Sequence, residues 1–173
     1  MSTPLPDKQR AMGSSAGGAV GQNPVVFRVV KQFIQPHMKV LDFGAGKFAR
    51  QTAALRAMGH NVTAYDYHAK TGVHDPNALD HKYDLVYSSN VLNVQNSHAQ
   101  LLNTIHKASK AVHPQGMYIT NMPKGGPLYD AFRGMRPAEA AMSVEKILKS
   151  RFGEVSKFPM ASSHVWICKR PLV

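Results

Sequence analysis

Val40-Leu-Asp-Phe-Gly-Ala-Gly-Lys47 is the stretch of this 173-residue chain that best predicts its fold. Its apolar beginning belongs to a segment from Met38 to Phe43, which is short, bounded by proline and glycine, and typical of a buried strand. A second strand is predicted from Asn61 to Tyr65, and it delivers Asp66 at its carboxyl end. A strand, a glycine turn, a helix and a second strand therefore follow one another, which predicts an α/β sheet.

Two helices are expected around the first strand. The upstream helix begins at Asn23-Pro24, with Asn as N-cap and Pro as the first helical residue, and ends near Gln35, before a proline. The second helix follows the glycines and ends at Gly59. The residues expected to face the core are Val26, Phe27, Val30, Phe33 and Ile34 in the first helix and Phe48, Thr52, Leu55 and Met58 in the second.

The C-terminal half continues the alternation of strands and helices. A strand is predicted from Tyr83 to Ser89, and a capping box of Ser97 and Gln100 starts the next helix. The core stripe of that helix is Leu101, Leu102, Ile105, Ala108 and Val112, and it stops at Pro114 and Gly116. The remaining predicted elements are strands at Met117 to Asn121, Val155 to Phe158 and Val165 to Lys169, and a helix from Pro137 to Arg151.

This order predicts a three-layer αβα, Rossmann-like fold with a mostly parallel sheet and an antiparallel C-terminal hairpin. A strand between the second strand and Tyr83 is not evident, because Val73 is an isolated apolar residue in a polar segment. Residues 1–23 are rich in Gly, Ser and Pro, which predicts a flexible arm, and residues 24–173 form a single domain.

Composition favours a cytoplasmic protein. No apolar run approaches the roughly 20 residues that span a bilayer, and the first ten residues lack the apolar core of a signal peptide. The single cysteine, Cys168, cannot form an internal disulfide, which suits a reducing compartment.

The charge of the chain is strongly positive and unevenly distributed. Lys and Arg total 21 against 10 acidic residues, a net charge of +11. Residues 1–60 carry eight basic and two acidic side chains, residues 61–103 carry two and four, and residues 104–173 carry eleven and four. A positive field attracts polyanions, so nucleic acid is the first partner to consider, and a basic surface without a specific target is the alternative.

These motifs carry a resemblance to a known family. Asp42-Phe-Gly-Ala-Gly46 resembles the D-x-G-x-G turn of class I S-adenosylmethionine (SAM) dependent methyltransferases, and Asp66 resembles their acidic residue after the second strand. The resemblance extends through Asp84 to Asn90 and through Gly116 to Ile119, and it covers roughly residues 36–170. The segment Ser89 to Val94 is also similar to small methyltransferase-like proteins of phages and of DNA phosphorothioation systems.

The resemblance implies SAM as the cofactor. Physical chemistry supports a nucleoside ligand, because glycines let the backbone turn tightly against it and Asp66, 22 positions after Gly44, can accept hydrogen bonds from ribose hydroxyls. The implied cofactor residues are Asp42, Phe43, Gly44, Ala45, Gly46, Asp66, Tyr67, Asp75, Ser89 and Asn90. By analogy with the family, the Gly-rich segment from Ser14 to Gln22 is expected to close over the cofactor as a lid.

Two alternatives to this cofactor site stay open. Gly44, Gly46 and Ala49 also satisfy a dinucleotide-binding G-x-G-x-x-A pattern, although Asp42 stands where an apolar residue is usual in that fold and suits a cationic amino acid ligand. In the second alternative, the glycines only form a tight turn whose carboxylates are satisfied by local backbone. Asp75 has its own alternative as part of an Asp-Pro-Asn turn.

The methyl acceptor is less well defined. The segment Ser88-Ser-Asn-Val-Leu-Asn93 occupies the place of the N/D-P-P-Y/F motif of amine methyltransferases, from which it departs. Asn90 could bind SAM or substrate or could cap a turn. Tyr129 and Phe132 lie between the cations of residues 124–136, which suits a flipped base or single strand unless the aromatics anchor the loop. The expected substrate residues are Asn90, Asn93, Lys124, Tyr129 and Arg133.

No metal site and no cysteine nucleophile is predicted. The spacing of His68, His74 and His81 matches no pattern of metal ligands, so solvated histidines are expected. His164 and Cys168 can share a strand face, but no third partner completes a nucleophilic site. Two function classes remain: a methyltransferase acting in line on nucleic acid, and a non-catalytic binding or inhibitory protein with the same fold.

Overall fold

The computed structural model describes residues 25–46, 48–66, 74–126 and 128–172. The predicted arm at residues 1–23, including the lid segment, and the predicted cofactor residue Tyr67 lie outside these ranges. Among the described residues, no helix has the length and apolar character needed to cross a membrane.

A six-stranded sheet forms the centre of the molecule, in the order β2-β1-β3-β4-β6-β5. The strands are β1 (Lys39–Phe43), β2 (Asn61–Tyr65), β3 (Tyr83–Ser88), β4 (Val112–Pro123), β5 (Phe152–Phe158) and β6 (Ser163–Pro171). Strands β1 to β4 pair in parallel, whereas β6 pairs antiparallel with both β4 and β5. The predicted α/β class and its antiparallel hairpin are confirmed.

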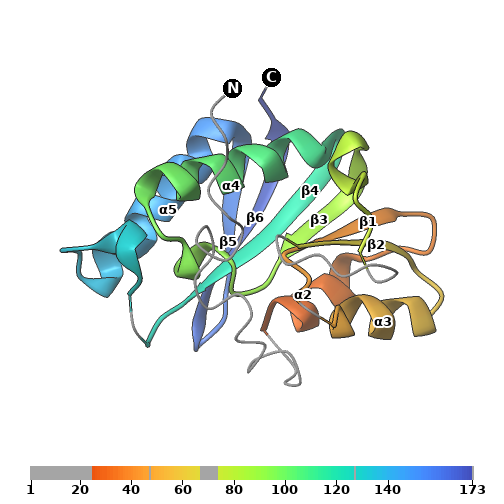
Figure 1. Cartoon of the computed structure of the whole chain (residues 1–173), viewed down its shortest axis with the longest axis horizontal. Coiled ribbons are helices and arrows are strands. Elements are labelled where there is room, and N and C mark those ends of the chain that lie inside the picture. The colour runs from red at the N-terminus through yellow and green to blue at the C-terminus, as the bar shows by residue number, and fades with distance from the viewer. Residues whose placement is uncertain (1–24, 47, 67–73, 127, 173) are drawn as a thin grey trace.

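Helices cover both faces of the sheet (Figure 1). Helices α2 (Val25–Phe33) and α3 (Arg50–Ala57) lie on one face, and α4 (His98–Ala111) and α5 (Pro137–Arg151) lie on the other. Short 3-10 helices are η2 (Ala78–Asp80), η3 (Leu92–Val94) and η4 (Asp130–Phe132). Residues 74–82, between β2 and β3, hold η2 and no strand.

Each face has its own apolar core. The α4–α5 side contains Leu101, Val144 and Trp166, and the α2–α3 side contains Val30, Leu55 and Val165. Strand residues alternate between the two faces, as the two-residue period of a strand requires. In β1, Leu41 and Phe43 therefore belong to the α4–α5 core, while Val40 belongs to the other.

Three predictions about the helices were wrong in detail. Phe48 and Met58 are 53% and 52% exposed rather than buried, because α3 begins only at Arg50 and ends at Ala57, so neither residue follows its helical phase. Leu102 is 41% exposed. Helix α4 ends at Ala111 and not at the proline, because Val112 already pairs with β3 as the first residue of β4.

The predicted capping box is only half formed. The Ser97 hydroxyl accepts a hydrogen bond from the Gln100 backbone N–H at 3.1 Å, as an N-cap does. The Gln100 side-chain oxygen, however, is buried and has no hydrogen-bond partner among the described residues. The N-cap alone therefore starts α4.

Candidate cofactor site and acceptor edge

The order of the strands changes direction at β1, which creates a topological switch point between β1 and β3. From β1 the chain crosses to β2 on one side, and β3 and β4 follow on the other side of β1. In open α/β sheets, ligands bind outside the carboxyl ends of the strands at such a point. The glycine turn follows β1 and Ser89 follows β3, so the predicted cofactor and acceptor segments meet here.

The glycine turn is held against the end of β2 by backbone hydrogen bonds. Gly44 and Gly46 have positive φ angles of 85° and 81°, which side chains other than glycine rarely adopt. The N–H groups of Gly44 and Ala45 both donate to the carbonyl of Tyr65, at 2.8 and 2.9 Å. Strand β2 thus fixes the path of the turn.

Asp66 and His74 fix the second glycine. The Gly46 N–H donates to Oδ2 of Asp66 at 2.8 Å, in a buried position. His74 donates from Nε2 to the Gly46 carbonyl at 2.8 Å, because a carbonyl can only accept. His74 is 7% exposed, so the expectation of a solvated histidine is wrong at this position. No local pattern of residues predicts this contact, which joins positions 28 apart in the chain.

Gly44 also makes room for the neighbouring loop. A Cβ atom added at Gly44 would lie 2.4 Å from Cγ2 of Val91, the residue after Asn90. Real Cβ atoms do not approach so closely, so the missing side chain is used by a loop of this chain. The turn after β1 and the segment after β3 are therefore in direct contact.

Asp42 is buried beneath α3. Its Oδ2 accepts a hydrogen bond of 2.7 Å from the Thr52 hydroxyl, and its side chain is 2% exposed. Burial raises the pKa of Asp42 to about 6, against the lowering effect of Thr52, while the charge of Asp66 adds to the increase. Asp42 is thus the buried carboxylate nearest the glycine turn in sequence, and one of its oxygens holds α3.

Tyr87 lies beside this carboxylate. It pairs with Asp42 in the sheet, and its hydroxyl is close enough to lower the pKa of Asp42. That hydroxyl is buried and makes no hydrogen bond of acceptable geometry with the described residues. Burial, followed by the charge of Asp42, raises the pKa of Tyr87 well above 10, so the hydroxyl stays protonated and can donate.

Phe43 and Ala45 contribute backbone rather than functional side chains. Phe43 stacks on Tyr65, with ring centroids 5.6 Å apart, inside the α4–α5 core. Ala45 packs in a small apolar cluster with Ala49 and Ala64. Asp75 accepts a hydrogen bond from the Asn77 N–H at 2.8 Å, which is the local turn proposed as the alternative.

The segment after β3, which the sequence predicts to border the methyl acceptor, is organised by Asn90. Asn90 has a positive φ of 55°, a conformation that Asn tolerates better than most residues. Its backbone N–H donates to Oδ1 of Asn121 at 2.8 Å, and its Oδ1 accepts from Nδ2 of Asn121 at 2.9 Å. Asn121 also donates to the Ser163 hydroxyl at 2.9 Å, and that hydroxyl donates to the Met122 carbonyl.

Three other polar residues lie at or near this edge. Ser88 is fully buried and shares hydrogen bonds with the Tyr118 and Thr120 hydroxyls, at 2.6 and 2.7 Å, so it belongs to the sheet interior. Ser89 is half-buried at the end of β3. Asn93 lies in η3, and its Oδ1 is buried without a hydrogen-bond partner among the described residues.

The basic and aromatic segment after β4 is anchored to the body of the protein. Phe132 is 1% exposed and Tyr129 is half-buried. Lys124 donates from Nζ to the Met160 carbonyl at 3.1 Å. Arg133 pairs with Asp130 at 3.0 Å, and their side chains are 80% and 55% exposed. Phe132 therefore anchors this segment, while Arg133 remains accessible to a partner.

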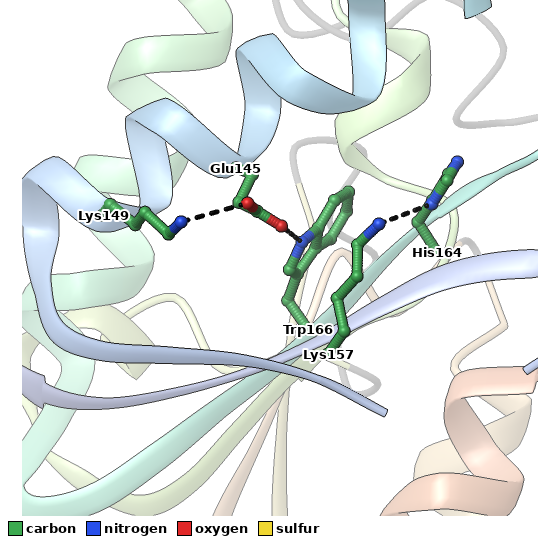
Figure 2. A network of polar contacts seen from close by, with 5 residues as sticks. All are labelled: Glu145, Lys149, Lys157, His164 and Trp166. Atoms are coloured by element: carbon green, nitrogen blue, oxygen red, sulfur yellow. Dashed lines mark hydrogen bonds and ion pairs between the residues drawn. The ribbon is translucent and has the colours of Figure 1, made fainter. Parts of the chain in front are cut away.

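A further polar network joins α5 to the hairpin (Figure 2). The Trp166 indole N–H donates to Oε1 of Glu145 at 2.9 Å, and Lys149 pairs with the other oxygen at 3.1 Å. The indole hydrogen bond, ahead of the Lys149 charge, lowers the pKa of Glu145. Trp166 is fully buried, so this network serves packing.

His164 and Cys168 share the same face of β6 without forming a nucleophilic pair. Lys157 lies 3.2 Å from Nδ1 of His164, which must accept because an ammonium group only donates. Burial and then the charges of Lys157 and Lys124 lower the pKa of His164. Burial also raises the pKa of Cys168 strongly, so its thiol stays protonated and unreactive.

Several residues of the site were not predicted from the sequence. Asn121 stands at the end of a predicted strand, so the rule that ligands lie at carboxyl ends could have identified it. Tyr87 and Ser163 carry no local signal, because their contacts depend on strand register. Val91 adjoins the predicted Asn90, but its approach to Gly44 is visible only in three dimensions.

Solved structures share this fold. A TehB-like SAM-dependent methyltransferase from Corynebacterium glutamicum is 18% identical, with 90% of this chain and 93% of that chain covered and a TM-score of 0.56. The 1,6-didemethyltoxoflavin-N1-methyltransferase of Burkholderia thailandensis, solved with S-adenosylhomocysteine (SAH), is also 18% identical, with 90% and 82% covered and a TM-score of 0.56.

A third similar structure is that of an rRNA methyltransferase. The 16S rRNA N2 G1207 methyltransferase of T. thermophilus, solved with SAM and guanosine, is 13% identical, with a TM-score of 0.57. The match covers 88% of this chain and 40% of that one. No family model matches the chain, and no curated protein sequence matches it. These similarities show the fold of the chain, a Rossmann-like fold that it shares with solved class I methyltransferases.

Proposed function

We propose that this protein is a SAM-dependent methyltransferase that transfers the methyl group in line to nucleic acid. One observation carries the cofactor assignment: the Gly44–Gly46 turn at the chain reversal is bound through the Gly46 N–H to Asp66. This arrangement brings a side-chain-free backbone and a carboxylate to one place, which a ribose and its amino acid substituent require. Similar folds solved with SAM or SAH support the assignment.

The residues around the turn fit SAM in charge and hydrogen bonding. Asp66 would accept hydrogen bonds from the ribose hydroxyls. Asp42 carries a buried carboxyl with a pKa of about 6, so it is mostly ionised at pH 7 and favours a cationic ligand. The protonated Tyr87 hydroxyl beside it lowers the pKa of Asp42 and so favours the ionised carboxylate.

SAM supplies an electrophilic methyl group, so the protein needs to align the reactants and exclude water. Gly46 would allow the ligand to lie against the backbone, whereas the space beside Gly44 is taken by Val91, and Asn90 would border the acceptor. Such a reaction does not require a strong general base, and none stands out among the described residues of the carboxyl edge.

Charge supports nucleic acid as the acceptor. The net charge of +11 favours association with a polyanion, and Arg133 and Arg136, three positions apart in sequence after β4, are both exposed. The resemblance of residues 89–94 to phage and phosphorothioation-associated proteins favours DNA as the first substrate to assay, with RNA second.

Calorimetry with SAM, SAH and NAD tests the cofactor. Asp66→Asn keeps an oxygen that can accept from Gly46 but loses the charge, so we expect SAM affinity to fall by about 10- to 100-fold. Asp80→Asn removes the same charge from an exposed residue of η2 and is expected to bind SAM as the wild type does. Binding of NAD in preference to SAM and SAH would contradict the proposal.

A second candidate function is a SAM-binding protein without catalytic activity. The observation that favours it is Ser89-Asn-Val-Leu92, which replaces the acceptor motif of amine methyltransferases. Radiolabelled SAM incubated with DNA and RNA distinguishes the two candidates. Label in either nucleic acid supports the enzyme, whereas tight SAM binding without transfer to any acceptor supports the second candidate.

A further inference from the structure

The hydrogen bonds around Asn121 have a fixed direction. The Asn90 backbone N–H can only donate, so the Asn121 atom that it contacts at 2.8 Å is the side-chain oxygen. The amide nitrogen of Asn121 must then face the opposite way. There it donates to Oδ1 of Asn90 and to the Ser163 hydroxyl, both at 2.9 Å.

The hydrogen bonds of Ser163 require the same orientation of the Asn121 amide. The Met122 carbonyl can only accept, so the Ser163 hydroxyl donates to it at 3.0 Å. The Ser163 oxygen is then free to accept from Asn121, as observed. Two backbone groups of fixed polarity therefore determine how both side-chain amides are oriented.

These hydrogen bonds also determine which atom of the Asn90 side-chain amide is left without a partner in the described part of the chain. Its oxygen is occupied by Asn121, and its NH2 group has no hydrogen-bond partner among the described residues. Asn90 is half-buried, and the next residue, Val91, touches the glycine turn at Gly44. The unused donor thus lies at the junction of the proposed cofactor turn and the acceptor edge.

We propose that Asn121 is a positioning residue that makes Asn90 present a hydrogen-bond donor to the methyl acceptor. The substrate would offer a hydrogen-bond-accepting atom there, a ring nitrogen or an oxygen of the nucleic acid, and not an exocyclic amine. This inference rests on the proposed function. An amine N–H facing the Asn90 NH2 would lose its water without gaining an acceptor, which disfavours amine substrates.

The orientation of the Asn90 and Asn121 side-chain amides can be tested without any ligand. In wild-type protein labelled with ¹⁵N, we expect the side-chain NH2 protons of Asn121 to be protected from exchange and those of Asn90 to exchange freely. The Asn121→Asp variant keeps an acceptor for the Asn90 N–H but cannot donate. Asn90 should then rotate its amide, donate to Asp, and gain protection. Protected Asn90 NH2 protons in the wild type would overturn the inference, even if the variant does not fold.

The effect on the acceptor position is testable with SAH and sinefungin, a SAM analogue that carries an amine in place of the methyl group. The wild type should bind SAH about tenfold more tightly than sinefungin. Asn121→Asp should shift this ratio about tenfold towards sinefungin, because Asn90 then presents its oxygen. Asn61→Asp is the matched control, because it makes the same substitution at an exposed residue that begins β2, at the opposite end of the strand from the site, and its ratio should equal that of the wild type.

The outcomes separate the two proposals. Equal ratios in the wild type and in Asn121→Asp, with SAH bound by both, would overturn the role of Asn90 while leaving the cofactor assignment intact. Loss of SAH binding by the wild type would contradict the proposed function, and the exchange experiment would still decide the polarity. If nucleic acid is methylated, N6-methyladenine or N4-methylcytosine as the product would also overturn the inference.

Discussion

The turn after β1 and the edge after β3 touch each other, yet they are held in different ways. The turn takes its shape from two glycines and from contacts to β2, the next strand in sequence. The edge takes its shape from Asn121 and Ser163, which are 31 and 73 positions away from Asn90 in sequence. The turn is therefore encoded in a short motif, whereas the edge depends on remote strands.

The largest effect is expected where the two regions meet. Gly44→Ala forces a left-handed conformation on a side chain and drives its Cβ to 2.4 Å from Val91, so we expect unfolding to become easier by about 3 kcal/mol. Urea denaturation measures this change. Gly59→Ala is the control, because Gly59 also has a positive φ but has nothing within 4 Å of an added Cβ.

We expect Gly59→Ala to cost only about 1 kcal/mol. Equal losses for the two variants would mean that Val91 does not press on the turn. Shortening the loop side chain with Val91→Ala in the Gly44→Ala background should recover part of the difference, and no recovery would also separate the two regions.

A pH dependence tests the burial of Asp42. Because its folded pKa of about 6 exceeds the ordinary value of 3.8, its contribution favours the folded state below pH 3.8 and is lost as pH rises through 6. Asp42→Asn should therefore gain stability relative to the wild type by about 3 kcal/mol between pH 3 and pH 8. Asp80→Asn, at an exposed position, should show no such pH-dependent gain.

Unfolding of both variants at several pH values supplies the measurement. A difference between Asp42→Asn and wild type that does not change with pH would show that Asp42 is well solvated. Binding of SAM by Asp42→Asn, measured in parallel, would show whether the carboxylate also serves a cationic ligand.

The buried hydroxyls of Thr52 and Ser163 allow the hydrogen-bond energies of the turn and of the edge to be compared. Thr52→Val removes the donor to the Asp42 carboxylate, and Ser163→Ala removes the donor to the neutral Met122 carbonyl. Hydrogen bonds to charged groups are stronger, so we expect losses of about 2 kcal/mol and about 1 kcal/mol respectively at pH 8. Thermal or urea unfolding at that pH would reveal the reverse order if the edge were the more tightly bonded region.

The smallest effect on stability is expected at Arg133. Its ion pair with Asp130 is exposed on both sides, so Arg133→Ala should change stability by less than about 0.5 kcal/mol. If this segment binds nucleic acid, the same variant should reduce the slope of log affinity against log salt by about one. An unchanged slope would exclude a phosphate contact by Arg133.

Sequence reasoning succeeded where structure depends on nearby residues. The strand, glycine turn and Asp66 were predicted because their periodicity and spacing lie within one short unit. The phase of α3 was misjudged because Ala49, with a φ of 47°, delays the start of the helix beyond Phe48. The burial of His74 was missed because its partner is a backbone carbonyl, which has no signature in the sequence.

The α/β class, the antiparallel end of the sheet and the position of the glycine turn are predictable from the residues alone, because they follow from local periodicity and backbone freedom. The three-dimensional arrangement was needed to find that Val91 occupies the space beside Gly44 and that the side-chain oxygen of Asn90 accepts from Asn121. These features arise from strand order and register, which bring β3, β4 and β6 together and thereby fix the direction of each hydrogen bond.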